Sequence, residues 1–206
     1  MRLKRTIGRS ALAVLALMFA LPAQDVKPTC NHCSATYIPT DEFQAYVKRA
    51  MANGLVDQQV RSVDIGKSQV GIGVVYRGKL DTPARDSVAE HDLISEVYHV
   101  IDGSATLMTG SDIVGMKRRP STLQTVREYN GPGNNGGSIT NGVTYQLKPG
   151  DVIVVPAGVG HLFTKIDDHI TYLMVRIDPD KAVPLKDETK SKAYLQSDPK
   201  GSGREK

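Results

Sequence analysis

Short apolar segments separated by turns limit the fold of this chain more than any other feature. After Gly54 the sequence repeatedly runs through stretches of about five to eight residues that are rich in valine and isoleucine and end at glycine or proline. Such segments at short intervals predict an all-β protein, an antiparallel sandwich or barrel. The sequence has no tryptophan and only three phenylalanines, so valine, isoleucine and leucine are expected to form most of the core.

The segments with this pattern can be placed along the chain. The expected strands lie within residues 59–66, 69–78, 94–103, 104–110, 143–150, 151–158 and 169–178. Turns are expected at Asp102–Ser104 and Lys148–Asp151. The sequence "GIG" at residues 71–73 lies inside a strand pattern with no helix after it. It therefore indicates a bulge or close packing and not a phosphate-binding loop.

One amphipathic helix is predicted before the strands. Thr40 is its expected N-cap, and Gly54 is expected to close its C-terminal end. Phe43, Val47 and Met51 recur every four residues. This spacing predicts one apolar stripe that packs against the strands that follow.

The first 23 residues have the three parts of a secretory signal. Four basic residues precede an apolar run from Ala11 to Leu21, and the small residue Ala23 follows as a cleavage site. We therefore expect a secreted or periplasmic protein that is cleaved near Ala23, with an uncleaved membrane anchor as the alternative. Removal of residues 1–23 takes away four positive charges and no negative ones, so the formal charge falls from +4 to 0. The basic composition is thus no evidence for a nucleic-acid partner, and no membrane contact is expected in the mature form.

The segment 24–38 contains the two cysteines of the chain in the sequence "CNHC". An oxidising compartment favours a disulfide between Cys30 and Cys33. A redox-active pair and a weak metal site with His32 are the alternatives. A closed structural zinc site is not expected, because the sequence has no second pair of cysteines.

The remaining chain is divided into one domain and a tail. Residues 39–183 have the length of a single domain, with a core expected over residues 70–178. The glycine-rich segment 111–142 is expected to be a long loop, either a lid over the barrel or a decorative insertion. Residues 184–206 are polar and carry glycine, serine and proline near their end, which predicts a disordered tail.

Two motifs give the fold a more specific interpretation. "GDVIVVPAGVGH", Gly150–His161, is similar to the second motif of the cupin family, except that Lys165 occupies the position of the family's final asparagine. "HDLISEVYHVIDG", His91–Gly103, resembles the first cupin motif in the spacing of its histidine, glutamate and glycine. The resemblance covers about residues 74–177. It implies the cupin double-stranded β-helix, a jelly-roll barrel, here preceded by the N-terminal helix.

The first motif departs from the family pattern in two places. Ala89 stands where the family usually has the first histidine of a His-x-His pair, and Pro83 replaces the leading glycine. A gap shifted by one residue would put Asp92 at the position of the second histidine. The resemblance therefore implies a reduced set of metal ligands: His91, Glu96 and His161.

The chemistry of this ligand set agrees with the resemblance. Two neutral imidazoles and one carboxylate form a facial triad that binds a divalent transition metal and leaves positions open for substrate, water or dioxygen. Iron or manganese is favoured, and copper, zinc or nickel are alternatives. A metal would also compensate the charge of Glu96, because a buried carboxylate without a partner is costly. The missing histidine makes a metal-free site the alternative.

Strand alternation assigns roles to the neighbouring side chains. Glu96 and Tyr98 share one face and are the candidate catalytic residues, Tyr98 as an acid or hydrogen-bond donor. A plain core tyrosine is the alternative for Tyr98. His99 lies on the opposite face and is expected to point outward, and His169 is expected at the surface.

The resemblance implies several functions, because cupins include dioxygenases, isomerases, lyases, decarboxylases and binding proteins. The favoured one is an exported metal-dependent oxidoreductase, dioxygenase-like, that acts on a small organic or sugar-derived molecule. A metal-assisted isomerase or lyase and a non-catalytic ligand-binding cupin are the alternatives. A homodimer is also implied, with "SQVGIGVVYRG" at residues 68–78 as a possible edge strand.

Overall fold

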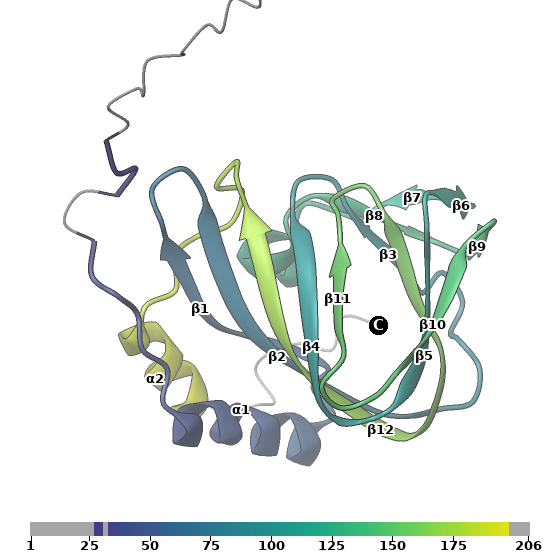
Figure 1. Ribbon diagram of the computed structural model, residues 1–206, viewed down its shortest axis with the longest axis horizontal. Coiled ribbons are helices and arrows are strands. Elements are labelled where there is room, and N and C mark those ends of the chain that lie inside the picture. Colours follow the sequence, from purple (N-terminus) through teal and green to yellow (C-terminus); the bar gives the residue numbers. More distant parts are fainter. Residues whose placement is uncertain (1–26, 31–32, 198–206) are drawn as a thin grey trace, which may run out of the picture.

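A computed structural model describes residues 27–30 and 33–197 of the chain. In this part of the chain two antiparallel sheets face each other as a jelly roll (Figure 1). The first sheet has the order β1 (Asp57–Asp64), β2 (Gln69–Leu80), β12 (Gly160–Asp178), β4 (Ser95–Gly103) and β11 (Val152–Val155). The second sheet has the order β10 (Val143–Leu147), β5 (Ala105–Gly110), β12, β3 (Val88–His91), β8 (Gly133–Gly136) and β7 (Lys117–Arg118).

Strand β12 belongs to both sheets and joins them. Its first residues pair with β3 and β5, and its later residues pair with β2 and β4. The pairing with β2 is irregular between Ile166 and His169, where the strand passes from one sheet to the other. A strand that changes sheets at such a bend makes the corner of a two-sheet barrel. His161 is therefore held in the second sheet while the end of the same strand runs beside Glu96 in the first.

The space between the sheets is filled by the side chains that strand alternation directs inward. The main core cluster consists of Val75, Tyr98, Val100, Ala105, Leu107, Leu147, Val155, Phe163, Ile166, Ile170, Tyr172 and Met174. Seven of these twelve residues are valine, isoleucine or leucine, and four others are methionine or aromatic. Valine, isoleucine and leucine therefore form most of this cluster, as the composition predicted.

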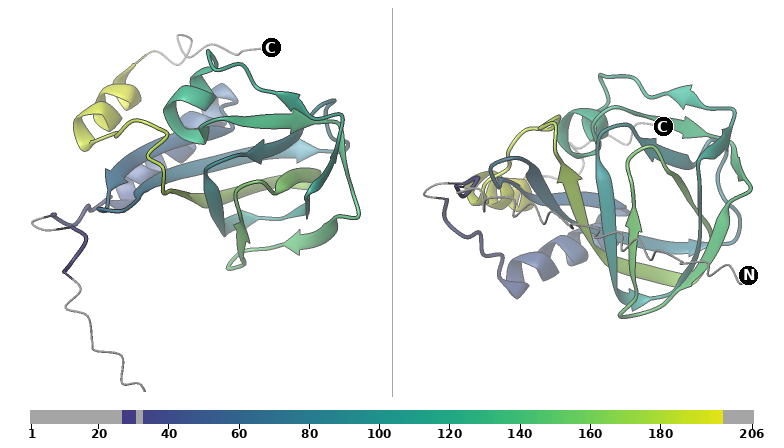
Figure 2. Two further views of the ribbon diagram at one scale, coloured as in Figure 1. Left: turned by 90° about the horizontal axis from the view of Figure 1, so that it is seen from above. Right: turned by 45° about the horizontal axis from the view of Figure 1, so that its top comes forward.

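Helix α1 (Thr40–Asn53) lies against the outer face of β1 and β2 (Figures 1 and 2). Gly54 ends it in the left-handed conformation, as predicted, with φ 62°. The predicted N-cap is wrong, because Pro39 occupies that position and Thr40 is the first helical residue. The predicted stripe is confirmed for Phe43 and Val47, which pack against the cluster that includes Val60 and Val74 of the strands. Its third member is wrong: Met51 is 58% exposed, and the fully buried residues of the helix are Tyr46 and Ala50. The Tyr46 ring packs against the outer face of β1 and β2. The four-residue spacing used for the prediction did not include this tyrosine.

The predicted disorder of residues 184–206 is wrong for the part that the structure describes. Residues Glu188–Gln196 form helix α2, and Asp187 caps it by accepting a hydrogen bond from the backbone N–H of Lys190. The Tyr194 ring stacks on Tyr46 of α1 at 5.4 Å between centroids. This contact supplies the apolar partner that the tail's own sequence lacks. Residues 198–206 of the predicted tail lie outside the described residues.

The segment 111–142 is not the long loop that the sequence predicted. It contains β6 (Asp112–Val114), β7, a single π-helical turn η1 (Val126–Asn130), β8 and β9 (Ser138–Thr140). β6 pairs with β9, and β8 pairs with β3. These strands have two to four residues each, too short to give an alternating pattern in the sequence. Their pairing makes the segment one side of the barrel.

The glycines of "GIG" allow a close approach of polar side chains, as predicted. A Cβ atom at Gly71 would lie 2.2 Å from Nε2 of Gln59, and one at Gly73 would lie 3.1 Å from Nη1 of Arg176. The pairing of β1 with β2 is also shifted beside them, between Gln59 and Arg61. These two glycines therefore leave the room in which Arg176 reaches the barrel interior.

Strand β2 is not an edge strand, so the predicted dimer edge at residues 68–78 is wrong. β1 and β12 pair with β2 on its two sides. A strand that is paired on both sides has no free backbone groups for a second copy. The predicted leader at residues 1–23 lies outside the described residues, and no helix among those described has the length and apolarity needed to span a membrane.

The two cysteines lie in the chain just before α1. Cys30 and Cys33 form a disulfide, which agrees with the favoured reading of their spacing. The two residues between them lie outside the described part of the chain, and His32, the predicted alternative partner, is one of them.

Candidate functional site

Three side chains from different strands meet inside the barrel. His91 ends β3, Glu96 is the second residue of β4 and His161 is the second residue of β12. Nε2 of His91 lies 3.4 Å from Oε1 of Glu96, and Nε2 of His161 lies 3.5 Å from Oε2 of the same carboxylate. All three are buried, and one ligand atom from each lies within 4.8 Å of the others. The structure thus brings together the three predicted metal ligands, which we call the His–Glu–His cluster.

The two sequence motifs hold each other in place at this cluster. The backbone N–H of Gly158 donates a hydrogen bond to the carbonyl of His91 at 2.8 Å, and Gly158 has a φ of 81°. The N–H of Ala157 donates to Oγ of Ser95 at 3.0 Å, next to Glu96. The turn "PAGVG" before His161 therefore packs on the chain around His91 and Glu96. A side chain at Gly158 would strain this turn, because the left-handed region favours glycine.

Glu96 already has a compensating charge within the protein. Nε of the buried Arg176 lies 3.3 Å from Oε1, and the Tyr98 hydroxyl donates a hydrogen bond of 2.7 Å to Oε2. Arg176 also pairs with Asp57 and donates to Oε1 of Gln59 at 2.7 Å. A buried carboxylate requires such partners, so its position does not by itself require a metal.

The titration state of the cluster follows from its burial and its charges. Burial lowers the pKa of His91 to about 3 and also lowers the pKa of His161, so both rings are neutral at pH 7. Burial alone would raise the pKa of Glu96. The neighbouring His91 and His161 rings, Arg176 and the Tyr98 hydroxyl outweigh this effect and lower it to about 2. Neutral imidazoles and an ionised carboxylate are the forms that coordinate metal ions.

The contact at Nδ1 of each ring determines whether Nε2 carries a proton or a lone pair that can bind a metal. Nδ1 of His161 lies 3.4 Å from the Val159 carbonyl, an acceptor that favours the tautomer with a lone pair on Nε2. Nδ1 of His91 instead lies 3.0 Å from Nη2 of Arg119, which can only donate. This contact puts the proton of neutral His91 on Nε2, towards Glu96. The cluster therefore fits a metal in residue type, position and burial, but Arg119 has to release His91 for the ion to bind.

The other predicted site residues lie in different places. Tyr98 faces the interior, where burial and Glu96 raise the pKa of its hydroxyl well above the ordinary value. His99 is exposed on the other face of β4, as predicted. Asp92 is outside the cluster and pairs with Arg118, so the alternative alignment that made it a ligand is not supported.

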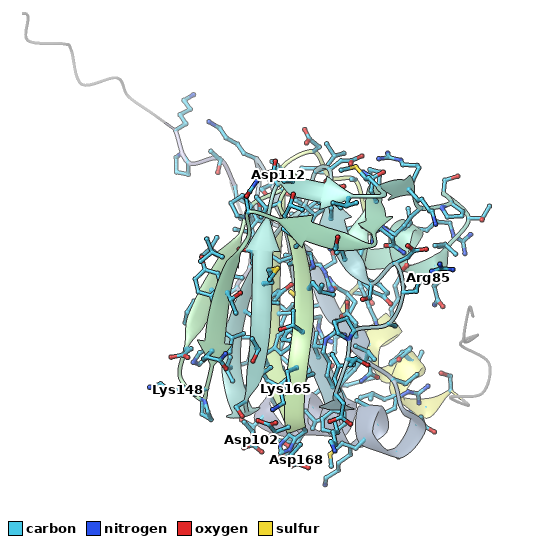
Figure 3. The ribbon with its side chains drawn as sticks, turned by 90° about the vertical axis from the view of Figure 1, so that its right-hand side faces the viewer. Arg85, Asp102, Asp112, Lys148, Lys165 and Asp168 are labelled. Atoms are coloured by element: carbon cyan, nitrogen blue, oxygen red, sulfur yellow. A yellow bond between two sulfur atoms is a disulfide. The ribbon has the colours of Figure 1, made fainter. Side chains whose placement is uncertain are left out.

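His169 lies far from the cluster, in the middle of β12. Its ring nitrogens lie 2.7 Å from Oδ2 of Asp168 and 3.2 Å from Oδ2 of Asp102. Figure 3 shows Asp102 and Asp168 together at one end of the barrel and Asp112 at the other. Glu96 lies near the start of β4 and Asp102 near its end, so His169, which contacts Asp102, belongs to the barrel end away from the site.

Arginines near the cluster were not identified from the sequence. Arg176 follows Tyr172 and Met174 at two-residue spacing, so alternation could have indicated that it faces inward. Arg77 has the same relation to Val75. Arg119 lies outside any regular alternation, and no signal in the sequence places it beside His91.

The comparison with known families gives one match. A sequence model of the AraC-like ligand binding domain, which has a cupin-type fold, matches residues 136–204, the part that contains the turn before His161. The jelly roll, the two motifs and this match agree on one fold family. The described part of the chain has the fold of a small cupin domain. The family model covers 69 of the 206 residues, and no curated protein matches the chain.

Solved structures resemble this cupin domain in fold. A protein of Bacillus halodurans aligns at 12% identity over 79% of this chain and 98% of its own, with a TM-score of 0.40. The DMSP lyase DddQ of Ruegeria pomeroyi aligns at 18% identity over 64% of this chain and 50% of its own, with a TM-score of 0.35. A cupin protein of Bacteroides fragilis aligns at 11% identity over 54% and 68%, with a TM-score of 0.33. The chain thus spans half of the lyase's length, and these likenesses carry no functional argument.

Proposed function

We propose that the chain is an exported, metal-dependent cupin that acts on a small organic or sugar-derived molecule, with an oxidoreductase reaction favoured. One observation carries the proposal: His91, Glu96 and His161 offer two imidazole nitrogens and a carboxylate within 4.8 Å of one another in a buried site. Three ligands of this kind leave coordination positions open, which a reaction at the metal requires.

The chain's own residues would hold and tune the site. His91, Glu96 and His161 would bind the ion, and iron or manganese is favoured over copper, zinc or nickel. When bound, such a metal supplies Lewis acidity and one-electron chemistry with dioxygen. Tyr98 fixes one oxygen of Glu96 and Arg176 lies beside the other, so the carboxylate is held in one orientation. The apolar and aromatic side chains around the cluster limit access of water to it.

The reaction class is tested by oxygen consumption. Protein loaded with ferrous iron or manganese is incubated with a panel of small hydroxy acids, keto acids and sugars while an oxygen electrode records uptake. Uptake that depends on substrate and disappears in H161A supports an oxidoreductase. Substrate turnover without oxygen uptake would assign the site to an isomerase or lyase, where the metal acts as a Lewis acid only.

A non-catalytic binding cupin is the second candidate. It is favoured by the contact between Arg119 and Nδ1 of His91, which leaves the cluster satisfied without a metal. The ion pair between Arg176 and Glu96 also favours this candidate, because it compensates the charge of the carboxylate without a metal. Protein that binds a small molecule tightly in the presence of a chelator, with no turnover, would favour this candidate.

Export and dimerisation remain parts of the proposal. The leader pattern in residues 1–23 and the disulfide between Cys30 and Cys33 both support an oxidising compartment. Mass spectrometry of protein from the periplasm or medium tests the cleavage near Ala23. The homodimer cannot use β2 as its edge; among the described strands β1, β7, β10 and β11 each pair with a single neighbour in their sheet. Light scattering on the purified protein measures its oligomeric state.

A further inference from the structure

Arg77 of β2 directs its side chain into the barrel. Val75, two residues earlier on the same face, belongs to the main core cluster. The guanidinium carbon of Arg77 lies 4.8 Å from the centroid of the Phe163 ring, and its Nε donates to the Tyr172 hydroxyl at 3.4 Å. The guanidinium therefore lies over the face of one aromatic ring and is hydrogen-bonded to the hydroxyl group of another.

This guanidinium has no anionic partner among residues 27–30 and 33–197. No carboxylate oxygen in that part of the chain lies within 4.0 Å of an Arg77 nitrogen. The other inward arginine, Arg176, pairs with both Asp57 and Glu96. A largely buried cation without a counter-charge is costly, and such groups are usually paired. Arg77 is thus a partly buried cation that has no ion-pair partner among the described residues.

Arg77 and His161 line the same pocket. The pocket has a volume of about 160 Å³, below the roughly 300 Å³ at which pockets for drug-sized ligands begin. Ser87 is the remaining polar lining residue, and the other lining side chains are apolar. Ala89 also lines it and pairs with His161 across the strands, so a methyl group stands where the first cupin motif usually has a histidine. The pocket therefore offers a small molecule one cation and one edge of the His–Glu–His cluster.

We propose that Arg77 anchors the carboxylate of a small organic acid whose other end reaches the His–Glu–His cluster. This assignment of a substrate class rests on the proposed function for the role of the cluster, but not for the anchor itself. Arginine binds a carboxylate through two parallel N–H···O bonds, which fixes the orientation of the acid as well as its charge. The apolar walls accept the carbon skeleton, and the small volume excludes long chains.

The test compares charged and uncharged probes on the full chain. Acetate, glycolate and oxalate are titrated by ligand-observed NMR against acetamide, glycolamide and oxamide, with inorganic phosphate as a further arm. The variants are R77Q, which removes the charge, and R77K, which keeps the charge but cannot form the two parallel hydrogen bonds of a guanidinium. R85Q is the matched control, because Arg85 is exposed at the outer surface (Figure 3). The metal content and melting temperature of each protein are measured in parallel.

We expect at least one of the three acids to bind about 10- to 100-fold more tightly than its amide, the size of a charge-assisted hydrogen-bond effect. R77Q should lose this preference, R77K should keep part of it, and R85Q should keep all of it. The metal content of R77Q should equal that of the wild type. If R77Q does not fold, the comparison of each acid with its amide on the wild-type protein still tests whether the pocket prefers a carboxylate.

Three results would overturn the anchor: equal affinity for acids and amides in the wild type, unchanged acid binding in folded R77Q, or Arg77-dependent binding of phosphate in preference to every acid. Wild-type protein that lacks metal but binds an acid through Arg77 would support the anchor while the proposed metal function fails. Metal-containing protein that binds no acid would overturn the anchor and leave the proposed metal site standing.

Discussion

Arg119 occupies the side of His91 that faces away from Glu96, with its Nη2 3.0 Å from Nδ1 of the ring. The same Nη2 donates to the Glu90 carbonyl. Because a guanidinium only donates, it sets the His91 proton on Nε2, the nitrogen that points into the cluster. One arginine therefore determines whether His91 acts as a donor to Glu96 or as a ligand for a metal.

Replacement of Arg119 should strengthen metal binding. R119Q removes a positive charge near the cation and offers a side-chain oxygen that can accept the Nδ1 proton, so Nε2 becomes free. Changes in such supporting contacts alter affinity by about 10- to 100-fold, and we expect an increase of at least about tenfold for Mn²⁺ by calorimetry. R118Q is the control, because Arg118 is exposed and pairs with Asp92 away from the cluster. Weaker binding in R119Q would show that Arg119 supports the ligand form of His91.

Removal of the Tyr98 hydroxyl should destabilise the fold. Y98F deletes the hydrogen bond of 2.7 Å to Oε2 of the buried Glu96 and keeps the ring that packs on Tyr172. Hydrogen bonds to charged groups contribute about 1.5–3 kcal/mol, so urea unfolding should show a loss of that order. Y145F, a change at an exposed tyrosine, should stay within about 0.5 kcal/mol of the wild type. An unchanged free energy of unfolding in Y98F would mean that water replaces the hydroxyl.

Metal retention should be insensitive to mild acid. The pKa of His91 is lowered to about 3, mainly by burial, and that of Glu96 to about 2. Protons therefore begin to compete with the metal only when the pH falls close to these values. The metal content of the protein should be the same at pH 7 and at pH 5. It should fall below about pH 4. Equilibrium dialysis followed by elemental analysis measures this, and loss of half of the metal near pH 6.5, the ordinary value for histidine, would contradict it.

Helix α2 should contribute to the stability of the whole domain. Y194A removes the ring that stacks on Tyr46, together with the hydrogen bond of 3.0 Å from its hydroxyl to Oε1 of Gln58. Because the ring is only partly buried, we expect a loss of about 2 kcal/mol in urea unfolding, below the range for fully buried aromatic residues. Q196A, on the exposed end of α2, is the control. Equal free energies of unfolding for Y194A and wild type would contradict this role of α2 and would support the disordered tail that the composition predicts.

The sequence was sufficient for the strands of the core and for the ligand cluster, for an identifiable physical reason. Alternation at two-residue spacing places Glu96 and Tyr98 on one face and His99 on the other, and the turn before His161 has a fixed glycine pattern. These signals are local. The convergence of the two motifs follows from the resemblance to cupins, which supplies the long-range pairing that local signals lack.

The features that could not be predicted depend on contacts between distant segments. Helix α2 has few apolar residues and is held by Tyr46 from α1, about 145 positions earlier. The strands within 111–142 are stabilised by pairing with β3 and with each other and not by their own propensity. The partner of Glu96 was expected to be a metal, whereas Arg176 already lies beside it. Composition and spacing cannot show which of two compensating charges a carboxylate will meet.

The metal content of the protein as purified, without added metal, tests the central claim most directly. Elemental analysis of wild type, H91A, H161A and the controls H99A and H169A should find one transition-metal ion per chain in the wild type and in both controls. The same analysis should find little or none in H91A and H161A. Full metal content in the folded H91A or H161A variant, or none in the wild type even after incubation with iron or manganese, would contradict the account.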